Sequence, residues 1–331
     1  MQRSELDEMY SMCNTLTRKE FIEKITNYDQ IDYSNKAEPM KYIDPYTGKV
    51  RDEISIIRKQ CPLCDSDNFR YLFVKHGFDH MICNSCDLIF TLQVLDTKKI
   101  KFLEEGKEGN TYGNYKMNAV ANERDRTKFQ YVFEQLEKYT DIKEIFDFGS
   151  QAGTFLDWAS KTYNIIGHEF HRPIREIAQR KGHTVLYDNL ETIQFDKEFD
   201  LITCWDYLDH VLNPRTVIKN LSKYLKKGGL FFFAINNRDS LSARMMHEFS
   251  PMFVGPHHTM HFGISQLKIL MNDYELLYTE SYVSELNWLS NWLSFQNPEL
   301  GDAHLMFELF DPKKISELGM GIKLNAIFRK K

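Results

Sequence analysis

Four cysteines are the residues whose spacing most directly implies chemistry. Cys61 and Cys64 form one CxxC pair, eighteen residues follow, and Cys83 and Cys86 form a second pair. Two CxxC pairs at this separation are typical of a tetrahedral zinc site with four thiolate ligands. Because four thiolates leave no coordination position for a catalytic water, we expect a structural zinc ion. The alternative is a module of paired buried thiols without a metal.

A second group of reactive side chains lies in the segment 206–210. Asp206, Asp209 and His210 stand at positions i, i+3 and i+4, which share one face of a helical turn. Histidine titrates near neutral pH, so His210 is the expected catalytic base, oriented by Asp209 or Asp206. The same three residues could instead hold a divalent cation, or the Asp209-His210 pair could simply cap a helix. A later histidine group could approach the same pocket: His257, His258 and His261.

A glycine-containing turn follows an apolar strand near residue 147. Asp147 ends the strand, and Gly149 and Gly153 let the backbone turn tightly and approach a ligand closely. About twenty residues later, Glu169 stands where a carboxylate binds the ribose hydroxyls of an adenosine. The turn lacks the full GxGxxG pattern, which disfavours NAD.

The elements that position these residues alternate between strands and helices from residue 142 onward. Such alternation predicts an α/β fold with a mostly parallel, doubly wound Rossmann-like sheet. We expect the run Lys226–Gly229 to be the basic last turn and glycine cap of a helix. The predicted strands are Ile145–Gly149, Ile165–Gly167, His183–Tyr187, Asp200–Thr203, Leu230–Ile235, Glu275–Tyr282 and Ile322–Arg329, and the predicted helices are Phe155–Lys161, Pro173–Lys181, Pro214–Leu225 and Ser265–Asn272.

The first part of the chain has a different organisation. Residues 1–55 are polar with scattered apolar positions, which predicts an N-terminal helical extension. Residues 56–95 form a small zinc-ribbon module, with strands predicted at Phe69–Val74, His80–Ile82 and Leu88–Thr91. Residues 96–140 are a connector that ends in a helix, and residues 141–331 form the main domain.

The main domain resembles a class I S-adenosylmethionine-dependent methyltransferase. The resemblance is carried by the segments DFGSQAGTFLDWA, IIGHEF, YDNLETI, FDLITCWDYLDHVLNP, LKKGGLFFFAINN, HHTMHFGISQLKILMNDYEL and GIKLNAIFRKK. The last of these resembles the final antiparallel strand of these enzymes. A CPLC…CNSC module in front of this domain is similar to a bacterial subgroup associated with sugar, capsule or secondary-metabolite modification.

The resemblance implies a cofactor, S-adenosylmethionine, and a set of residues that bind it. Asp147, Gly149 and Gly153 would shape the methionine end of the site, and Glu169 would bind the ribose. Further contacts are implied at the adenine by Asp188, Asn189 and Leu190, at the sulfonium by Cys204, Trp205 and Asp206, and over the cofactor by Tyr112 and Tyr115.

Two features depart from the family's pattern. Gln151 stands where glycine is usual, and its side chain would crowd or hydrogen-bond the cofactor. A modified cofactor, or a domain that binds without catalysing, therefore stays open. The 206–210 segment also resembles the ExxEH arrangement of ubiquinone-pathway and small-RNA methyltransferases, with Asp replacing Glu twice. Because Asp reaches less far than Glu, this weakens the metal interpretation.

Composition limits the partners. The 331 residues carry a net charge of −5, and the segment between the two cysteine pairs is not a basic stripe, which argues against nucleic acid. The longest apolar run is far shorter than the ~20 residues that span a bilayer. The chain shows no apolar signal segment, and its cysteines suit a reducing compartment, so we expect a cytoplasmic protein.

The expected function is methylation, favoured at oxygen, of a small polar acceptor such as a sugar, nucleotide sugar or metabolite. The ribbon would frame the acceptor or a homodimer contact. The rivals are an RNA-modifying or nucleic-acid-binding protein and a non-catalytic scaffold.

Overall fold

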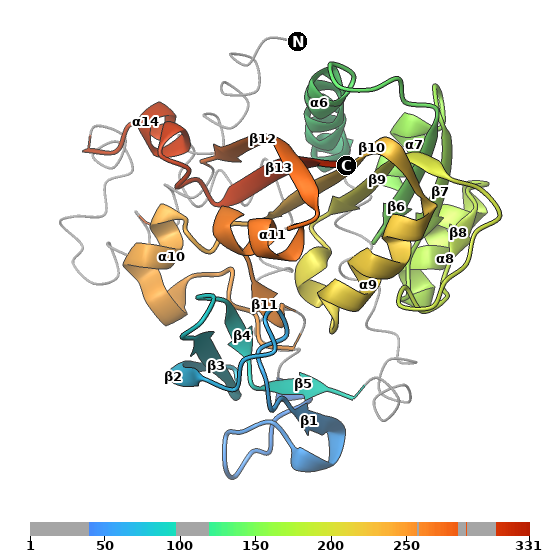
Figure 1. Ribbon diagram of the computed structural model, residues 1–331. Helices are drawn as coiled ribbons and strands as arrows, with labels where there is room; N and C mark the ends of the chain where they lie inside the picture. The colour runs from blue at the N-terminus through green and yellow to red at the C-terminus, as the bar shows by residue number, and fades with distance from the viewer. Residues whose placement is uncertain (1–39, 97–118, 257, 284–288, 290–308) are drawn as a thin grey trace.

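The computed structural model describes residues 40–96, 119–256, 258–283, 289 and 309–331 (Figure 1). Tyr112, Tyr115 and His257 lie outside these residues.

A seven-stranded sheet forms the centre of the main domain, in the order β12-β13-β10-β9-β6-β7-β8. Its bounds are β6 (Glu144–Phe148), β7 (Asn164–His168), β8 (Val185–Leu186), β9 (Phe199–Trp205), β10 (Leu225–Asn236), β12 (Tyr274–Tyr282) and β13 (Lys323–Lys330). The strands β8, β7, β6, β9 and β10 run parallel, whereas β13 is antiparallel to both of its neighbours. The predicted α/β fold and its final antiparallel strand are confirmed.

Helices cover both faces of this sheet (Figure 1). On one face, Phe129 of α6 (Ala119–Leu136) and Phe155 of α7 (Thr154–Ala159) pack against Trp205 of β9. On the other face, α9 (Pro214–Leu221) and α11 (Ile264–Leu270) bury their aliphatic side chains against β9, β10 and β13. Among the described residues, the remaining helices are α8 (Arg172–Arg180), α10 (Leu241–Met246) and α14 (Pro312–Glu317), and short 3-10 turns lie at Leu208–His210, Ser222–Tyr224 and His247–Phe249.

The segment before β10 differs from the prediction. Helix α9 ends at Leu221, a 3-10 turn follows, and the run Lys226–Gly229 lies inside β10 rather than capping a helix. Leu225 already pairs with Phe199 of β9, and the pairing is irregular between Leu225 and Leu230. Lys226 donates to Asp200 at 2.7 Å, so its charge is neutralised by a neighbouring strand end and not by a helix terminus.

The ribbon sheet contains a strand from the main domain. Strands β2 (Phe69–Lys75), β3 (Phe78–Cys83) and β4 (Ile89–Thr91) form an antiparallel meander, and β11 (Met260–His261) pairs with β4. Figure 1 shows β11 reaching down from the main domain to β4. The cluster that contains Leu63 and Phe90 also contains residues of the large sheet. The ribbon and the main domain therefore share one hydrophobic core.

The described residues 40–55 belong to the ribbon and not to a helical extension. Ile43 bridges to Val50, a 3-10 turn spans Asp52–Ile54, and β1 (Ser55–Ile57) pairs with β5 (Gln93–Leu95). The predicted boundary at residue 55 divides β1. Tyr42, Val50 and Ile54 pack with ribbon residues, so the module begins before residue 55. Among the described helices, none combines the length and apolarity that a membrane span requires.

Candidate functional site

The two cysteine pairs occupy matching turns. Each pair is followed by an aspartate with a left-handed backbone: Asp65 has φ of 59° and Asp87 has φ of 57°. The Asp65 amide donates to the Cys61 carbonyl at 3.0 Å, and the Asp87 amide donates to the Cys83 carbonyl at 2.9 Å. This repeated turn aims the thiols of both pairs at one point.

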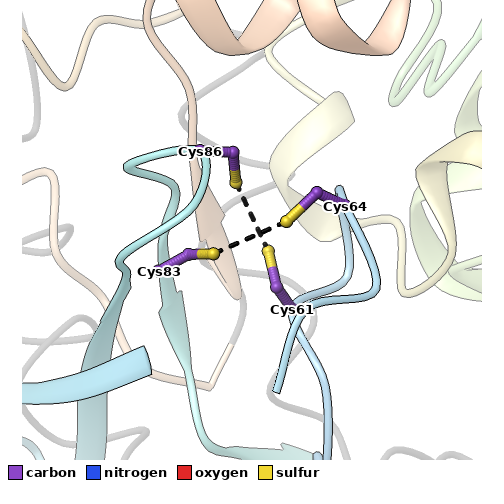
Figure 2. Close-up of side chains that lie close together, drawn as sticks. All are labelled: Cys61, Cys64, Cys83 and Cys86. Atoms are coloured by element: carbon purple, nitrogen blue, oxygen red, sulfur yellow. Dashed lines mark hydrogen bonds between the residues drawn. The ribbon is translucent and has the colours of Figure 1, made fainter. Parts of the chain in front are cut away.

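The four thiols meet at tetrahedral spacing (Figure 2). The Sγ atoms of Cys61 and Cys86 lie 3.6 Å apart, those of Cys64 and Cys83 lie 3.5 Å apart, and all four lie within 4.8 Å of one another. Four sulfurs at the usual Zn–S distance of about 2.3 Å stand roughly 3.8 Å apart. The cluster therefore fits zinc, and it is buried apart from the half-buried Cys64.

The glycine turn after β6 has a backbone that suits glycine at three points. Gly149, Gln151 and Gly153 have φ of 85°, 51° and 83°. A Cβ atom on Gly149 would lie 2.2 Å from the Tyr207 ring, and one on Gly153 would lie 2.9 Å from Ala178. The glutamine at position 151 is thus an L-residue in the left-handed region, where the family usually has glycine.

Two buried carboxylates flank this turn. Asp147 accepts from the Thr203 hydroxyl at 2.7 Å through Oδ1, while its Oδ2 has no hydrogen-bond partner among the described residues. Burial raises the pKa of Asp147 to about 7, and the charge of Glu169 adds to the increase. An orphaned, buried carboxylate oxygen of this kind is suited to receive a cationic group.

Glu169 stands at the end of β7. Its carboxylate accepts from the Gln151 amide at 3.1 Å and from the His171 amide at 2.8 Å. Burial raises the pKa of Glu169, and the two amide hydrogen bonds partly oppose this. The Gln151 contact uses the backbone, so the glutamine side chain does not displace the turn from Glu169.

The residues predicted at the adenine follow β8. The His168 imidazole contacts the Asp188 carbonyl at 2.8 Å and ties this loop to β7. Asn189 is exposed and its side-chain oxygen accepts from the Glu191 amide at 2.9 Å, while Leu190 is buried in the core. The structure therefore brings the loop to the edge of the sheet next to Glu169.

Two of the three residues predicted at the sulfonium, Cys204 and Trp205, lie deeper than expected. Cys204 is fully buried, and burial raises the pKa of its thiol. Trp205 packs among Phe129, Phe155 and Phe232 on the α6 face, and its indole nitrogen has no partner among the described residues. Both side chains are part of the core as the structure stands.

Tyr207 is a site residue that the sequence analysis did not single out. Its ring lies over Gly149 and is stacked on the His210 ring, with centroids 5.5 Å apart and an interplanar angle of 8°. It therefore connects the glycine turn to the acid–histidine segment. The sequence feature that could have pointed to Tyr207 is its position between the two acids Asp206 and Asp209.

A cluster of two histidines and one carboxylate lies after β9. The His258 Nδ1 is hydrogen-bonded to Asp209 Oδ2, and His210 Nε2 lies 3.8 Å from Asp209 Oδ1. The two imidazole rings have centroids 4.7 Å apart. Burial opposes ionisation of Asp209, but the charges of His258 and His210 and the hydrogen bond from His258 outweigh burial and lower its pKa.

Asp206 does not join this cluster, contrary to the prediction of a shared helical face. Asp206 has φ of 53°, and its carboxylate binds Lys323 Nζ on β13 at 2.6 Å. The left-handed residue interrupts the helical spacing before the 3-10 turn Leu208–His210 begins. Its place is taken by His258, while His261 is stacked on His80 in the ribbon core with ring centroids 5.7 Å apart.

Comparison with known proteins adds to this geometry. The family model described as "Methyltransferase domain" matches residues 119–281, which include the glycine turn, Glu169 and the Asp209–His258 cluster. The chain carries a methyltransferase domain of the class I fold. The order of the seven strands and the antiparallel β13 agree with this assignment.

The chain spans about half the length of the curated relatives it matches. An uncharacterized protein of Methanocaldococcus jannaschii is 30% identical over 102 residues, which are 30% of this chain and 50% of the relative. A ubiquinone biosynthesis O-methyltransferase of Histophilus somni is 27% identical over 125 residues, which are 34% of this chain and 52% of the relative. A solved S-adenosylmethionine-dependent methyltransferase of Thermotoga maritima shares 19% identity at a TM-score of 0.46, covering 70% of this chain and 99% of its own.

The chemical groups that line the glycine turn of this methyltransferase domain suit those of S-adenosylmethionine. The orphaned Asp147 oxygen can receive the ammonium of the methionine end, and Glu169 retains lone pairs for ribose hydroxyls. Gly149 and Gly153 leave two positions of the turn without a side chain. When bound, the cofactor supplies an activated methyl group, and the protein's part is to place the acceptor and to accept a proton.

Proposed function

We propose that this methyltransferase uses S-adenosylmethionine to methylate a small polar acceptor, with oxygen as the favoured acceptor atom. The observation that carries the proposal is the pair of buried carboxylates, Asp147 and Glu169, on either side of a turn with three left-handed residues. Burying two acids next to each other is costly unless a ligand with positive charge and hydroxyl groups uses them. The methionine ammonium and the ribose supply both.

His210 is the proposed base. Asp209 lies beside His210 and favours its protonated form, which is the form produced when it takes a proton from the acceptor. His258 is hydrogen-bonded to Asp209 and keeps that carboxylate ionised and oriented. The side chain of His210 is 31% exposed, so an acceptor can reach it. Asp206, bound to Lys323, is proposed to shape the cofactor site.

Residues from several other segments would complete the cofactor site. Cys204 and Trp205 would contact the cofactor through backbone groups, because their side chains are buried. Asp188, Asn189 and Leu190 would border the adenine. Tyr112 and Tyr115, outside the described residues, would close over the cofactor. We also propose a cytoplasmic location and a homodimer contact.

The test of the cofactor is a mass spectrum of the protein as purified, combined with calorimetric titration with S-adenosylhomocysteine. Retained S-adenosylhomocysteine, or binding that weakens at least tenfold in Glu169→Gln, supports the proposal. Absence of binding in the zinc-loaded protein would favour the non-catalytic scaffold instead.

A second candidate for the cluster is a divalent cation site. Ligand atoms of Asp209, His210 and His258 lie within 4.8 Å of one another, which is compatible with one ion. The two interpretations differ in a simple measurement. A base mechanism is insensitive to EDTA once the ribbon zinc is retained, whereas a cation mechanism is abolished by EDTA and restored by added Mg²⁺ or Mn²⁺.

A further inference from the structure

The ribbon contacts the main domain at the segments that carry the acid–histidine cluster. His258 is followed by Thr259 and then by β11, which pairs with β4 of the ribbon through Met260 and Phe90. The Thr91 amide, at the end of β4, donates to the Thr259 carbonyl at 3.0 Å. The backbone next to His258 is thus a continuation of the ribbon sheet.

Thr259 also holds Asp209. Its amide donates to the Asp209 carbonyl at 2.9 Å, and its hydroxyl donates to the same oxygen at 3.3 Å. With the hydrogen bond between His258 and Asp209, three hydrogen bonds join the segment that contains Asp209 to the segment that contains His258 and Thr259. The ribbon, Thr259 and Asp209 form a continuous chain of hydrogen bonds.

Arg58 contacts both segments at once. Its Nη1 donates to the Thr259 carbonyl at 3.3 Å, and its Nη2 donates to the Thr259 hydroxyl and to the Leu212 carbonyl, each at 3.4 Å. Leu212 lies two residues after His210. The Arg58 amide donates to the Leu92 carbonyl at 2.9 Å, so its backbone is fixed by the ribbon three residues before Cys61.

We propose that Arg58 is a positioning residue, which fixes the Leu212 and Thr259 segments and so holds His210, Asp209 and His258 in their working arrangement. The proposal rests on the proposed function for its catalytic meaning. It makes the ribbon part of the active-site architecture, because the Leu92 carbonyl of the ribbon anchors the Arg58 backbone. A planar guanidinium suits this role since it can reach three acceptors on two segments, whereas an ammonium is a single point of contact.

Burial supports this assignment. Burial lowers the pKa of Arg58 to about 10, and a guanidinium is seldom placed in such surroundings without acceptors for its donors. A second arginine contact between the ribbon and the main domain serves as a matched control. Arg215 of α9 binds Asp65, both side chains are more than half exposed, and the contact does not involve the segments of the cluster.

The experiment follows the NMR signal of the proton shared by His258 and Asp209. This measurement does not require a methyl acceptor. An imidazole N–H hydrogen-bonded to a buried carboxylate gives a low-field proton signal in NMR, and Asp209→Asn assigns it by its loss. Variants Arg58→Met, Arg58→Lys and Thr259→Val are compared with Arg215→Gln in zinc-loaded protein. Zinc content and S-adenosylhomocysteine affinity are measured on each.

The expected result is loss of the low-field signal in Arg58→Met and Thr259→Val, partial recovery in Arg58→Lys and no change in Arg215→Gln. Zinc content stays at one ion per chain, and S-adenosylhomocysteine affinity stays within threefold. A signal that persists in Arg58→Met would overturn the proposal. Loss of zinc or of the fold in Arg58→Met and Arg58→Lys alike would also overturn it, because Arg58 would then serve the ribbon itself. Failure of every protein to bind S-adenosylhomocysteine would instead refute the proposed function and leave the NMR result interpretable.

Discussion

His258 and Asp209 are hydrogen-bonded to each other although 49 positions separate them in the chain. Asp209 follows a strand of the large sheet, whereas His258 precedes a strand of the ribbon sheet. The pair therefore marks the place where the two modules meet. It also gives Asp209 a second imidazole partner besides the adjacent His210.

We expect Asp209→Asn to lower methyl transfer by about 10²–10³-fold, in the range that general acid–base groups contribute. An amide cannot stabilise the protonated imidazole or fix its orientation. The assay follows the labelled methyl group of S-adenosylmethionine into a small-molecule extract. Affinity for S-adenosylhomocysteine should change less than threefold.

The control for this prediction is Asp157→Asn. Asp157 of α7 also binds a histidine, His183 between α8 and β8, at 2.7 Å, and neither residue belongs to the cluster. Asp157→Asn should therefore leave methyl transfer within twofold of the parent chain. Equal losses in the two variants would contradict a specific role for Asp209.

Local patterns predicted the large sheet and the cysteine cluster well. The thiol spacing depends on two short turns, and the strands of the main domain are continuous apolar runs, so both are encoded within a few neighbouring residues. The end of α9 was missed because Lys226–Gly229 has the composition of a helix cap, while the pairing of Leu225 with Phe199 decides its conformation. Tertiary pairing outweighed local preference there.

The candidate site was predicted only in part, since its arrangement depends on backbone conformation and distant contacts. The helical spacing of Asp206 with Asp209 failed because Asp206 adopts a left-handed backbone and binds Lys323. The pairing of β11 with β4 brings His258 in and directs His261 away. A two-residue strand carries too little pattern to be recognised from the sequence.

The pH dependence of cofactor binding should reflect Asp147. The pKa of this carboxyl is raised to about 7, and an ammonium ligand binds its ionised form. Affinity for S-adenosylmethionine should therefore rise with pH, by at most about tenfold per pH unit, and level off above about pH 7. Calorimetry between pH 5.5 and 8.5 measures this. Glu169 titrates in the same direction, so Asp147→Asn should flatten the profile without abolishing the dependence.

The stability of the ligand-free protein should also depend on pH through the Asp147 carboxyl. Its pKa is higher in the folded state than in the unfolded state, so its contribution to folding is greatest below about pH 4. That contribution is lost as the pH rises through about 7, by up to ~4 kcal/mol. Asp147→Asn should thus gain stability over the parent in urea unfolding at pH 8, with the gain shrinking toward pH 4. A constant difference across this range would contradict the buried, protonatable carboxyl.

Zinc removal should weaken the methyltransferase sheet as well as the ribbon. Structural zinc contributes an apparent ~10–16 kcal/mol in small zinc domains, which is comparable to the whole stability of a typical domain. Because Phe90 and Leu63 share a core with the large sheet, loss of the metal should lower a single cooperative thermal transition. Cys61→Ser with Cys83→Ser, or a chelator, tests this by calorimetry. Two separate transitions, with the larger one unchanged, would show that the modules are independent.

Gly149→Ala should disrupt the site through Tyr207. The new Cβ would lie 2.2 Å from the tyrosine ring and would also occupy a backbone at φ of 85°. We expect a loss of about 1–3 kcal/mol in the free energy of unfolding and a decrease of more than tenfold in S-adenosylhomocysteine affinity, because the ring must move toward the proposed cofactor.

Gly182→Ala is the matched control, since Gly182 has φ of 92° and an added Cβ would lie in open space. It carries the backbone cost of about 1–2 kcal/mol alone and should leave binding unchanged. Equal loss of binding in both variants would show that Tyr207 does not border the cofactor.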